Sequence, residues 1–259
     1  MNTGNPVIDI RNLYFRFSSD SADVLSNLSM QIYPHTINAI LGPNGSGKTT
    51  LLRLALGLLK PYSGEVLING RPAHTDNSDI KRLVSIVPQT ERFSFELNIL
   101  EYVLLGRAPH LSLFQLPTDE DRRIAFEAIK TVGLQHLIQR PVSYLSGGEN
   151  QLARIARALT QETNIILLDE PTAHLDLANI SKITRIMHQL SDQGKTIIYS
   201  TNDPNIVSIA ADNVLMLKNH HIMAAGIPSD VFTSANLSEL YGIKVDVFRQ
   251  DGKYFAAIR

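Results

Sequence analysis

Residues 42–49 read GPNGSGKT, and this stretch decides the fold. It matches the phosphate-loop pattern, in which a glycine is followed five positions later by Gly-Lys-Thr. The apolar run TINAIL precedes it at 36–41, and the helical pattern TTLLRLALGLL follows at 49–59. A strand, a glycine-rich loop and a helix in this order predict an α/β protein with a P-loop NTPase core of the RecA-like type. A chance glycine-rich turn is the alternative, and it would not explain this context.

The loop has the groups that a nucleoside triphosphate needs. Its glycines let backbone N–H groups turn toward phosphate oxygens, and the helix N-terminus adds the positive end of its dipole. We expect Lys48 to neutralise the β and γ phosphates and Thr49 to offer its hydroxyl to Mg²⁺. The predicted ATP-binding residues of this loop are Gly42, Pro43, Asn44, Gly45, Ser46, Gly47, Lys48, Thr49 and Thr50.

A second motif, NIILLDEP at 164–171, ends a short apolar strand with two carboxylates. Ligands bind at the carboxyl ends of strands in open α/β sheets, so this position suits catalysis. We expect Asp169 to hold magnesium, through water, and Glu170 to orient the attacking water or accept its proton. The alternative is that Glu170 is a solvated turn residue.

The order of apolar patterns predicts how the chain is divided. Alternating patterns at 7–17 and 24–33 predict an N-terminal antiparallel β subdomain, and helical patterns at 98–106, 119–134 and 149–161 predict an inserted α-helical subdomain. The last residues read as a short helix and a hairpin around Asp251-Gly252. The predicted division of the single domain 1–259 is a β subdomain plus core at 1–88 and 160–235, a helical subdomain at 89–159 and a C-terminal extension at 236–259.

Composition narrows the class of protein. The chain has 259 residues, 44% of them hydrophobic, which excludes a disordered protein. A formal net charge of -1 argues against nucleic acid as a partner. With no cysteine there is no disulfide, thiolate metal site or cysteine nucleophile. The first residues lack a signal-peptide pattern and no run approaches about 18 apolar residues, so we expect a cytoplasmic protein.

A third motif, LSGGENQ at 145–151, precedes the helical pattern LARIARAL. A hydroxyl and glycine N–H groups at a helix start can form a second anion site. Alternatively, Ser146 is only a helix cap, with Glu149 completing a capping box. With the phosphate loop and the Asp-Glu strand in this order, the chain resembles the ATP-binding cassette (ABC) family, and the resemblance covers nearly its whole length.

That resemblance implies a head-to-tail homodimer with two ATP molecules between the subunits. Ser146, Gly147 and Gly148 of one subunit would close on the ATP held by the phosphate loop of the other. The family also has a loop after the catalytic glutamate, which AHLD at 173–176 matches, so Asp176 is expected to face the partner subunit.

Two further positions take their roles from the resemblance. Gln89, which ends the strand pattern LVSIVPQ, matches the glutamine that senses magnesium and links the site to the helical lobe; it would otherwise be an exposed loop residue. Phe17 lies where the family has an aromatic ring stacked on adenine. Because Tyr14 and Phe15 are close and strand aromatics are usually core residues, Phe17 could instead belong to the core.

The chain departs from the family pattern at two places. Pro34-His35 replaces a common Pro-Gly, which alters a turn. More important, Asn202 stands where the family has its switch histidine. An amide can donate a hydrogen bond to the γ-phosphate but cannot carry a proton or charge at pH 7. Losing one transition-state donor slows reactions by about 10² to 10³, so we expect ATP binding and dimer closure to survive and hydrolysis to be slowed.

Two kinds of function remain possible for such an ATPase. It could power membrane transport, or it could be a soluble ATPase that acts on DNA or ribosomes. The chain has one cassette and no long coiled coil between its motifs, which favours transport. GRAPH at 106–110, the segment 120–134, HLD at 174–176 and the tail 226–245 resemble the importers of iron-siderophores, haem and cobalamin. That subfamily implies a separate membrane permease, a periplasmic or lipoprotein substrate-binding protein, and a location on the inner face of the cell membrane. An importer of an oxyanion such as molybdate stays possible.

Overall fold

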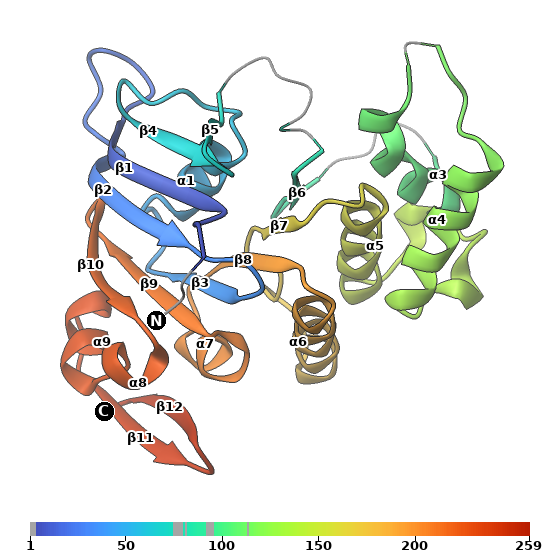
Figure 1. Cartoon of the computed structure of the whole chain (residues 1–259). Coiled ribbons are helices and arrows are strands. Elements are labelled where there is room, and N and C mark those ends of the chain that lie inside the picture. Colours follow the sequence, from blue (N-terminus) through green and yellow to red (C-terminus); the bar gives the residue numbers. More distant parts are fainter. Residues whose placement is uncertain (1–3, 75–79, 81, 92–95, 113) are drawn as a thin grey trace.

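The computed structural model describes residues 4–74, 80, 82–91, 96–112 and 114–259, and its core is a six-stranded sheet (Figure 1). The strand order is β10-β9-β3-β8-β7-β6. The strands are β3 (Ile37–Leu41), β6 (Val84–Val87), β7 (Ile165–Leu168), β8 (Thr196–Thr201), β9 (Asn213–Lys218) and β10 (His221–Gly226). All neighbours pair in parallel except β10, which runs antiparallel to β9. The P-loop NTPase core expected from the sequence is confirmed.

Both faces of this sheet are covered, which explains why its strands read as continuous apolar runs. The helices of the core are α1 (Lys48–Ala55), α6 (Leu177–Asp192) and α7 (Pro204–Ala210). In β7, Ile165 and Leu167 belong to the apolar cluster that includes α1, whereas Ile166 and Leu168 belong to the cluster that includes α6 and α7. Figure 1 shows α6 and α7 on the side of the sheet opposite the N-terminal strands.

The predicted antiparallel β subdomain is also present, as a four-stranded sheet with the order β2-β1-β4-β5. Its strands are β1 (Ile8–Phe15), β2 (Leu25–Ile32), β4 (Ser63–Ile68) and β5 (Arg71–Pro72). Its apolar face and α1 share one core, to which Ile8, Leu28 and Leu52 contribute. Helix α1 is shorter than the pattern at 49–59 because Gly57 turns the chain with φ +76°. A Cβ there would lie 2.0 Å from the Ala73 carbonyl oxygen.

Between β6 and β7 the chain forms the expected helical lobe, at the right of Figure 1. Its elements are α3 (Ile99–Leu104), η1 (Leu105–His110), α4 (Asp119–Thr131), η2 (Gln135–Leu137), η3 (Val142–Tyr144) and α5 (Gly147–Thr160). Each of the three α-helices begins with a capping box, at Asn98, Thr118 and Ser146. Two backbone N–H groups at each helix start are thereby satisfied, which fixes where these helices begin.

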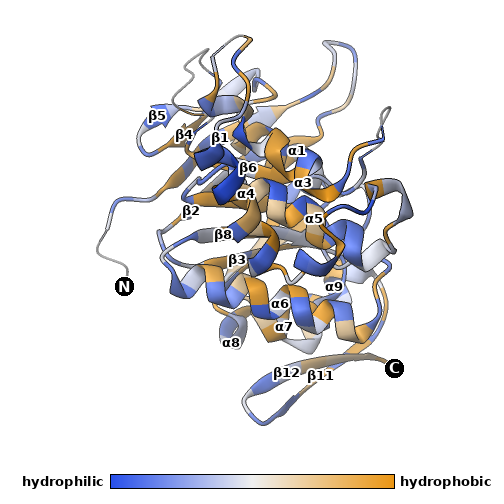
Figure 2. Cartoon of the chain, turned by 90° about the vertical axis from the view of Figure 1, so that its right-hand side faces the viewer, coloured by the Kyte–Doolittle hydropathy of each residue, from blue (hydrophilic) through white to orange (hydrophobic). Residues whose placement is uncertain are grey.

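After β10 the chain ends in α8 (Pro228–Val231), α9 (Ser234–Tyr241) and a hairpin of β11 (Val245–Gln250) and β12 (Lys253–Ile258). The hairpin projects from the body of the molecule (Figure 2). Asp251 and Gly252 turn it with φ +50° and +79°, as the Asp-Gly signal predicts. The helix starts three residues before the expected Leu237, because Thr233 caps it.

Helices α6 and α7 are not predicted by the patterns considered above. In α6 the buried residues Ile183, Ile186, Met187 and Leu190 have helical spacing. The many polar residues between them make the apolar pattern of this segment weak. Within the described residues, no helix is long and apolar enough to span a membrane.

The GRAPH segment contains a buried ion pair that joins parts of the helical lobe. Arg107 donates from Nε to Asp121 Oδ1 at 2.7 Å and from Nη1 to the Thr160 carbonyl oxygen at 2.9 Å and to Glu162 Oε2 at 2.7 Å. Hydrogen bonds from Thr118, followed by the Arg107 guanidinium, lower the pKa of Asp121 from 3.8 to about 2. This carboxylate therefore stabilises the folded chain above pH 3.8, and the contribution disappears as the pH falls toward 2.

We expect Asp121→Asn to lower the free energy of unfolding at pH 7 by about 1–2 kcal/mol, allowing for solvent screening. The difference from the unmodified chain should shrink as the pH falls toward 3. Denaturant unfolding at both pH values measures it, with Asp119→Asn, an exposed acid in the same helical turn, as the control. A difference independent of pH would contradict this interpretation.

Candidate nucleotide-binding site

The glycine-rich loop connects β3 to α1, as the sequence predicts, and two of its glycines have backbone conformations that other residues rarely adopt. Gly45 and Gly47 have φ values of +80° and +104°. A Cβ on Gly47 would lie 2.8 Å from Leu25 Cδ2 of the β subdomain. The loop therefore depends on glycine for its shape and for its close approach to β2.

Lys48, the first residue of α1, is buried and held by the loop that precedes it. Its ammonium group donates to the carbonyl oxygens of Gly42 at 2.9 Å and Pro43 at 3.1 Å, and lies 3.5 Å from Glu170 Oε1. Burial lowers the pKa of Lys48, and Glu170 opposes that shift. Anionic phosphate oxygens would stabilise this buried cation further.

A serine on the neighbouring strand holds both acidic residues at the end of β7, Asp169 by its carboxylate and Glu170 by its backbone. Ser200 Oγ of β8 donates to Asp169 Oδ1 at 2.7 Å and accepts from the Glu170 backbone N–H at 2.8 Å. Asp169 Oδ1 also accepts from Thr49 Oγ1 at 3.1 Å. Glu170 has φ +48°, a strained conformation of the kind often kept at functional sites.

Gln89 and Asn202 complete the group of predicted catalytic residues. Gln89 Nε2 donates to Glu170 Oε2 at 2.7 Å, and Asn202 Nδ2 donates to Asn44 Oδ1 of the phosphate loop at 3.3 Å. A cavity of about 590 Å³ lies between them. Its lining includes Val24, Asn44, Gly45, Gly47, Lys48, Thr49, Thr50, Gln89, Glu170, Ala173, His174 and Asn202. Predicted residues from four distant segments, namely the phosphate loop, Gln89, Glu170 and Asn202, thus converge on one cavity.

Other predicted residues lie outside this lining. Ser146 caps α5, accepting from the Glu149 N–H at 3.3 Å, so the capping interpretation holds within one chain. Asp176 caps α6 in the same way, accepting from the Asn179 N–H at 2.8 Å. Phe17 is 64% exposed and packs edge-on against Phe15. The expected contacts of these residues with a partner subunit or with adenine remain predictions.

Close packing explains one glycine of the signature without any ligand. A Cβ on Gly148 would lie 2.4 Å from the Asn179 side chain, so α5 and α6 approach each other at this point. This packing does not exclude a role for Gly147 and Gly148 toward a nucleotide on another subunit. It shows that the motif also has a structural function.

Sequence reasoning missed two residues of the site. Ser200 was not singled out because it lies inside the apolar strand pattern KTIIYST, in which a single serine does not by itself indicate a functional role. His174 lines the cavity with φ +60°, although only Asp176 of its AHLD loop was considered. The pairing of the two strands could have identified Ser200. Because β7 pairs with β8 in parallel and Leu168 lies beside Tyr199, the next residues, Asp169 and Ser200, are placed next to each other.

The fold and this site together define a P-loop protein that binds and hydrolyses a nucleoside triphosphate. Residues 25–173 match the family described as ABC transporter, and the chain belongs to this family. As an ATP-binding member it is an ATPase, and its substrate is ATP.

Comparison with individual proteins agrees with this assignment. A Helicobacter pylori ATP-binding protein named for iron chelatin transport is 34% identical over 95% of this chain and 97% of its own length. A molybdate import ATP-binding protein of Haemophilus influenzae is 33% identical over 96% of this chain and 93% of its own length. A solved structure described as a metal-chelate type ABC transporter, in an inward-facing conformation, has 31% identity and a TM-score of 0.85, covering 98% of this chain and 97% of its own.

We expect Glu170→Gln to lower kcat for ATP by at least about 10²-fold, because an amide is a far weaker base for the attacking water. KM for ATP should change little, since Lys48 and the loop remain. Steady-state phosphate release measures both, with Glu127→Gln on the exposed face of α4 as the control. A residual kcat within twofold of the unmodified chain would assign the base elsewhere.

Replacing Asn202 by His restores the family's switch residue and should raise kcat, by up to about 10² to 10³. The imidazole can carry charge and protons that the amide cannot. Single-turnover phosphate release with saturating ATP separates this effect from binding. Equal rates for Asn202→His and the unmodified chain would show that the amide already serves in place of histidine.

Proposed function

We propose that this chain is the ATP-hydrolysing subunit of a bacterial-type ABC importer, powering uptake of a metal chelate of the iron-siderophore, haem or cobalamin class through a separate membrane permease. The observation that carries this proposal is a groove between the core and the helical lobe, joined by an ion pair to the segment that begins at Gln89. A groove of this kind can receive a short helix from a permease.

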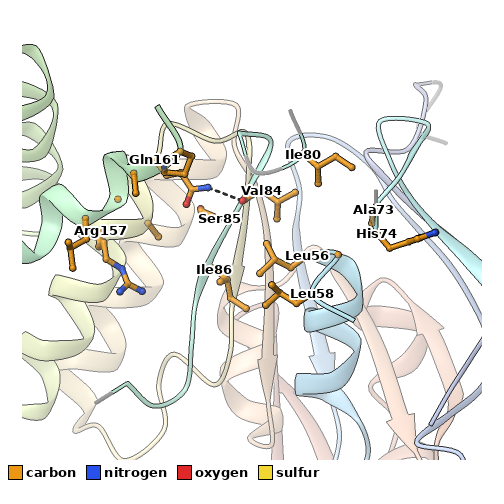
Figure 3. Close-up of a pocket in the computed structure, with 16 residues that line it drawn as sticks. Leu56, Leu58, Ala73, His74, Ile80, Val84, Ser85, Ile86, Arg157 and Gln161 are labelled. Atoms are coloured by element: carbon orange, nitrogen blue, oxygen red, sulfur yellow. Dashed lines mark hydrogen bonds between the residues drawn. The ribbon is translucent and has the colours of Figure 1, made fainter. Parts of the chain in front are cut away.

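The groove has a volume of about 580 Å³ (Figure 3). The core lines it with Leu56, Leu58, Val84 and Ile86, and the other side is lined by Arg157 of α5 and by Gln161, which follows α5 (Figure 3). The 3₁₀ helix η1 adds Leu105, Gly106, Ala108 and Pro109. Leu58 and Leu105 both line the groove and are 67% and 51% exposed, and apolar side chains exposed together in a groove suit the binding of another protein.

A chain of contacts leads from this groove to the nucleotide site. Arg157 lines the groove and forms an ion pair with Glu91, two residues after Gln89. Tyr102 of α3 donates to the same Glu91 at 2.8 Å, and Arg154 of α5 donates to the Gln89 carbonyl oxygen at 3.0 Å. Movement of the helical lobe would therefore displace Gln89, which contacts Glu170.

The residues of the site support ATP hydrolysis with magnesium. Thr49 and Asp169 bring a hydroxyl and a carboxylate within 3.1 Å, and oxygen ligands of this kind suit Mg²⁺, which would neutralise the charge that develops on the phosphates. Lys48 would bind the β and γ phosphates, Glu170 would orient the attacking water, and Asn202 would donate to the γ-phosphate.

Dimerisation would complete the site. Ser146 and Gly148 of a second copy would contact the ATP held by Lys48 and the loop, so that ATP favours the closed head-to-tail homodimer and hydrolysis reopens it. The proposed division into core, helical subdomain 89–159 and C-terminal extension 236–259 assigns the groove to the boundary between the first two. The chain would thus act at the inner face of the cell membrane as a peripheral subunit.

The relatives support a metal chelate as cargo more than an oxyanion, since one is named for iron chelatin and the solved structure for a metal chelate. The molybdate relative keeps an oxyanion importer as the second candidate. A substrate-binding protein in the same system would select among these cargoes. An ATPase without a transport partner is the third candidate.

Uptake assays in the source organism test the proposal. Deleting the gene should abolish uptake of one radiolabelled chelate among ferric siderophore, haem and cobalamin, and leave molybdate uptake unchanged. Loss of molybdate uptake alone would favour the oxyanion importer. Unchanged uptake of all four would favour an ATPase that is not coupled to transport.

The groove makes a sharper prediction. We expect Leu105→Asp to lower uptake to the level of the deletion strain, because a buried charge opposes docking of an apolar segment, while ATP turnover of the purified chain stays within about twofold. Ile258→Asp, at an apolar position of the C-terminal hairpin that is 79% exposed, is the control and should retain uptake. Normal uptake with Leu105→Asp would place the permease contact elsewhere.

A further inference from the structure

We propose that the C-terminal extension, residues 236–259, positions the switch residue Asn202, and that Tyr241 is the positioning residue. The inference rests on the proposed role of Asn202 at the γ-phosphate. It gives the extension a function in ATP hydrolysis, although the extension contributes no residue to the lining of the nucleotide cavity.

The direct contact joins the end of α9 to the switch. The Tyr241 hydroxyl donates to the main-chain carbonyl oxygen of Asn202 at 2.8 Å. Tyr241 is half-buried, and this burial, together with nearby Asp203, raises the pKa of its hydroxyl. The hydroxyl therefore remains protonated, and available as a donor, throughout the physiological pH range.

Asn202 is consequently held from two sides. Tyr241 fixes its backbone carbonyl, and its side-chain amide donates to Asn44 of the phosphate loop at 3.3 Å. The next residue, Asp203, caps α7 by accepting from the Asn205 N–H at 2.8 Å. The peptide between the switch and the helix is thus the point at which the extension acts.

The hairpin reinforces this hold by binding α7, which starts two residues after Asn202. Asn205 donates from Nδ2 to the Ala256 carbonyl oxygen at 3.3 Å and accepts from the Ala256 N–H at 2.9 Å. Ser208 accepts from the Tyr254 N–H at 2.6 Å. Two side chains of α7 thereby form hydrogen bonds with backbone N–H and C=O groups of β12.

The extension is itself anchored in the core, so it can hold Asn202 in a fixed position. Leu237, Leu240 and Val245 are buried in the apolar cluster that contains α6 and α7. A neutral amide stabilises a transition state only when its donor is already aimed at the charge that develops. Because Asn202 lacks the charge of an imidazolium, its contribution depends more strongly on such positioning.

The test is Tyr241→Phe, which removes one hydroxyl and keeps the ring. We expect kcat for ATP to fall by about threefold to tenfold, the worth of one hydrogen bond, with KM within about twofold. The thermal midpoint should fall by no more than about 4 °C. Tyr33→Phe, which removes the hydroxyl that donates to Gln31 Oε1 at 3.0 Å beside β2, is the matched control and should retain kcat.

A double-mutant cycle separates positioning from a general structural effect. In an Asn202→Ala background, Tyr241→Phe should have no further effect on kcat, because the group that it positions is gone. The same loss in both backgrounds, or an unchanged kcat in Tyr241→Phe alone, would overturn the inference. If Asn202→Ala alone retains full turnover, the role of Asn202 itself is wrong, and this outcome is distinguishable from a failure of Tyr241.

Discussion

Three parallel strands hold the catalytic groups at one level, and the rest of the structure depends on their register. Leu41 of β3 lies beside Thr201 of β8, and Leu168 of β7 lies beside Tyr199. The phosphate loop, the two carboxylates and the switch residue therefore leave the sheet within two residues of each other. Ser200 bonds both Asp169 and the Glu170 backbone, so a slip of one residue between β7 and β8 would separate the base from the loop.

The cavity formed by this register is bounded by residues of the β subdomain and core and by Gln89, whereas the signature residues lie at the start of α5 on the helical lobe. Ser146 and Gly148 have structural roles within one chain, as a helix cap and as a close contact with Asn179. Ser146 and Gly148 thus lie at the N-terminus of α5, where backbone N–H groups attract anions. In the proposed dimer, this helix start would therefore need little rearrangement to contact the nucleotide of the second subunit.

Much of the fold could be predicted because strand, glycine loop and helix follow one another locally, and because apolar runs mark the buried strands. The phosphate loop, Asp169 and Glu170 were predicted from motifs and Gln89 from the family resemblance, and hydrogen bonds connect Thr49 to Asp169 and Gln89 to Glu170. Ser200 and Tyr241 could not be predicted in this way. Ser200 matters only through a neighbouring strand, and Tyr241 contacts a residue 39 positions away in the sequence. Long-range contacts of this kind carry no local signal.

The contacts of Glu170 have a consequence for the timing of the reaction. Lys48 lies 3.5 Å from one of its carboxylate oxygens, and Gln89 donates to the other. A phosphate requires the same ammonium group, so the nucleotide and the base compete for a single cation. Binding of the nucleotide would weaken the ion pair between Glu170 and Lys48, and the proposed movement of Gln89 with the helical lobe would weaken the second contact of this carboxylate. Binding of the nucleotide would thus also release the carboxylate that orients the attacking water, so that the site and its fuel are coupled through Lys48.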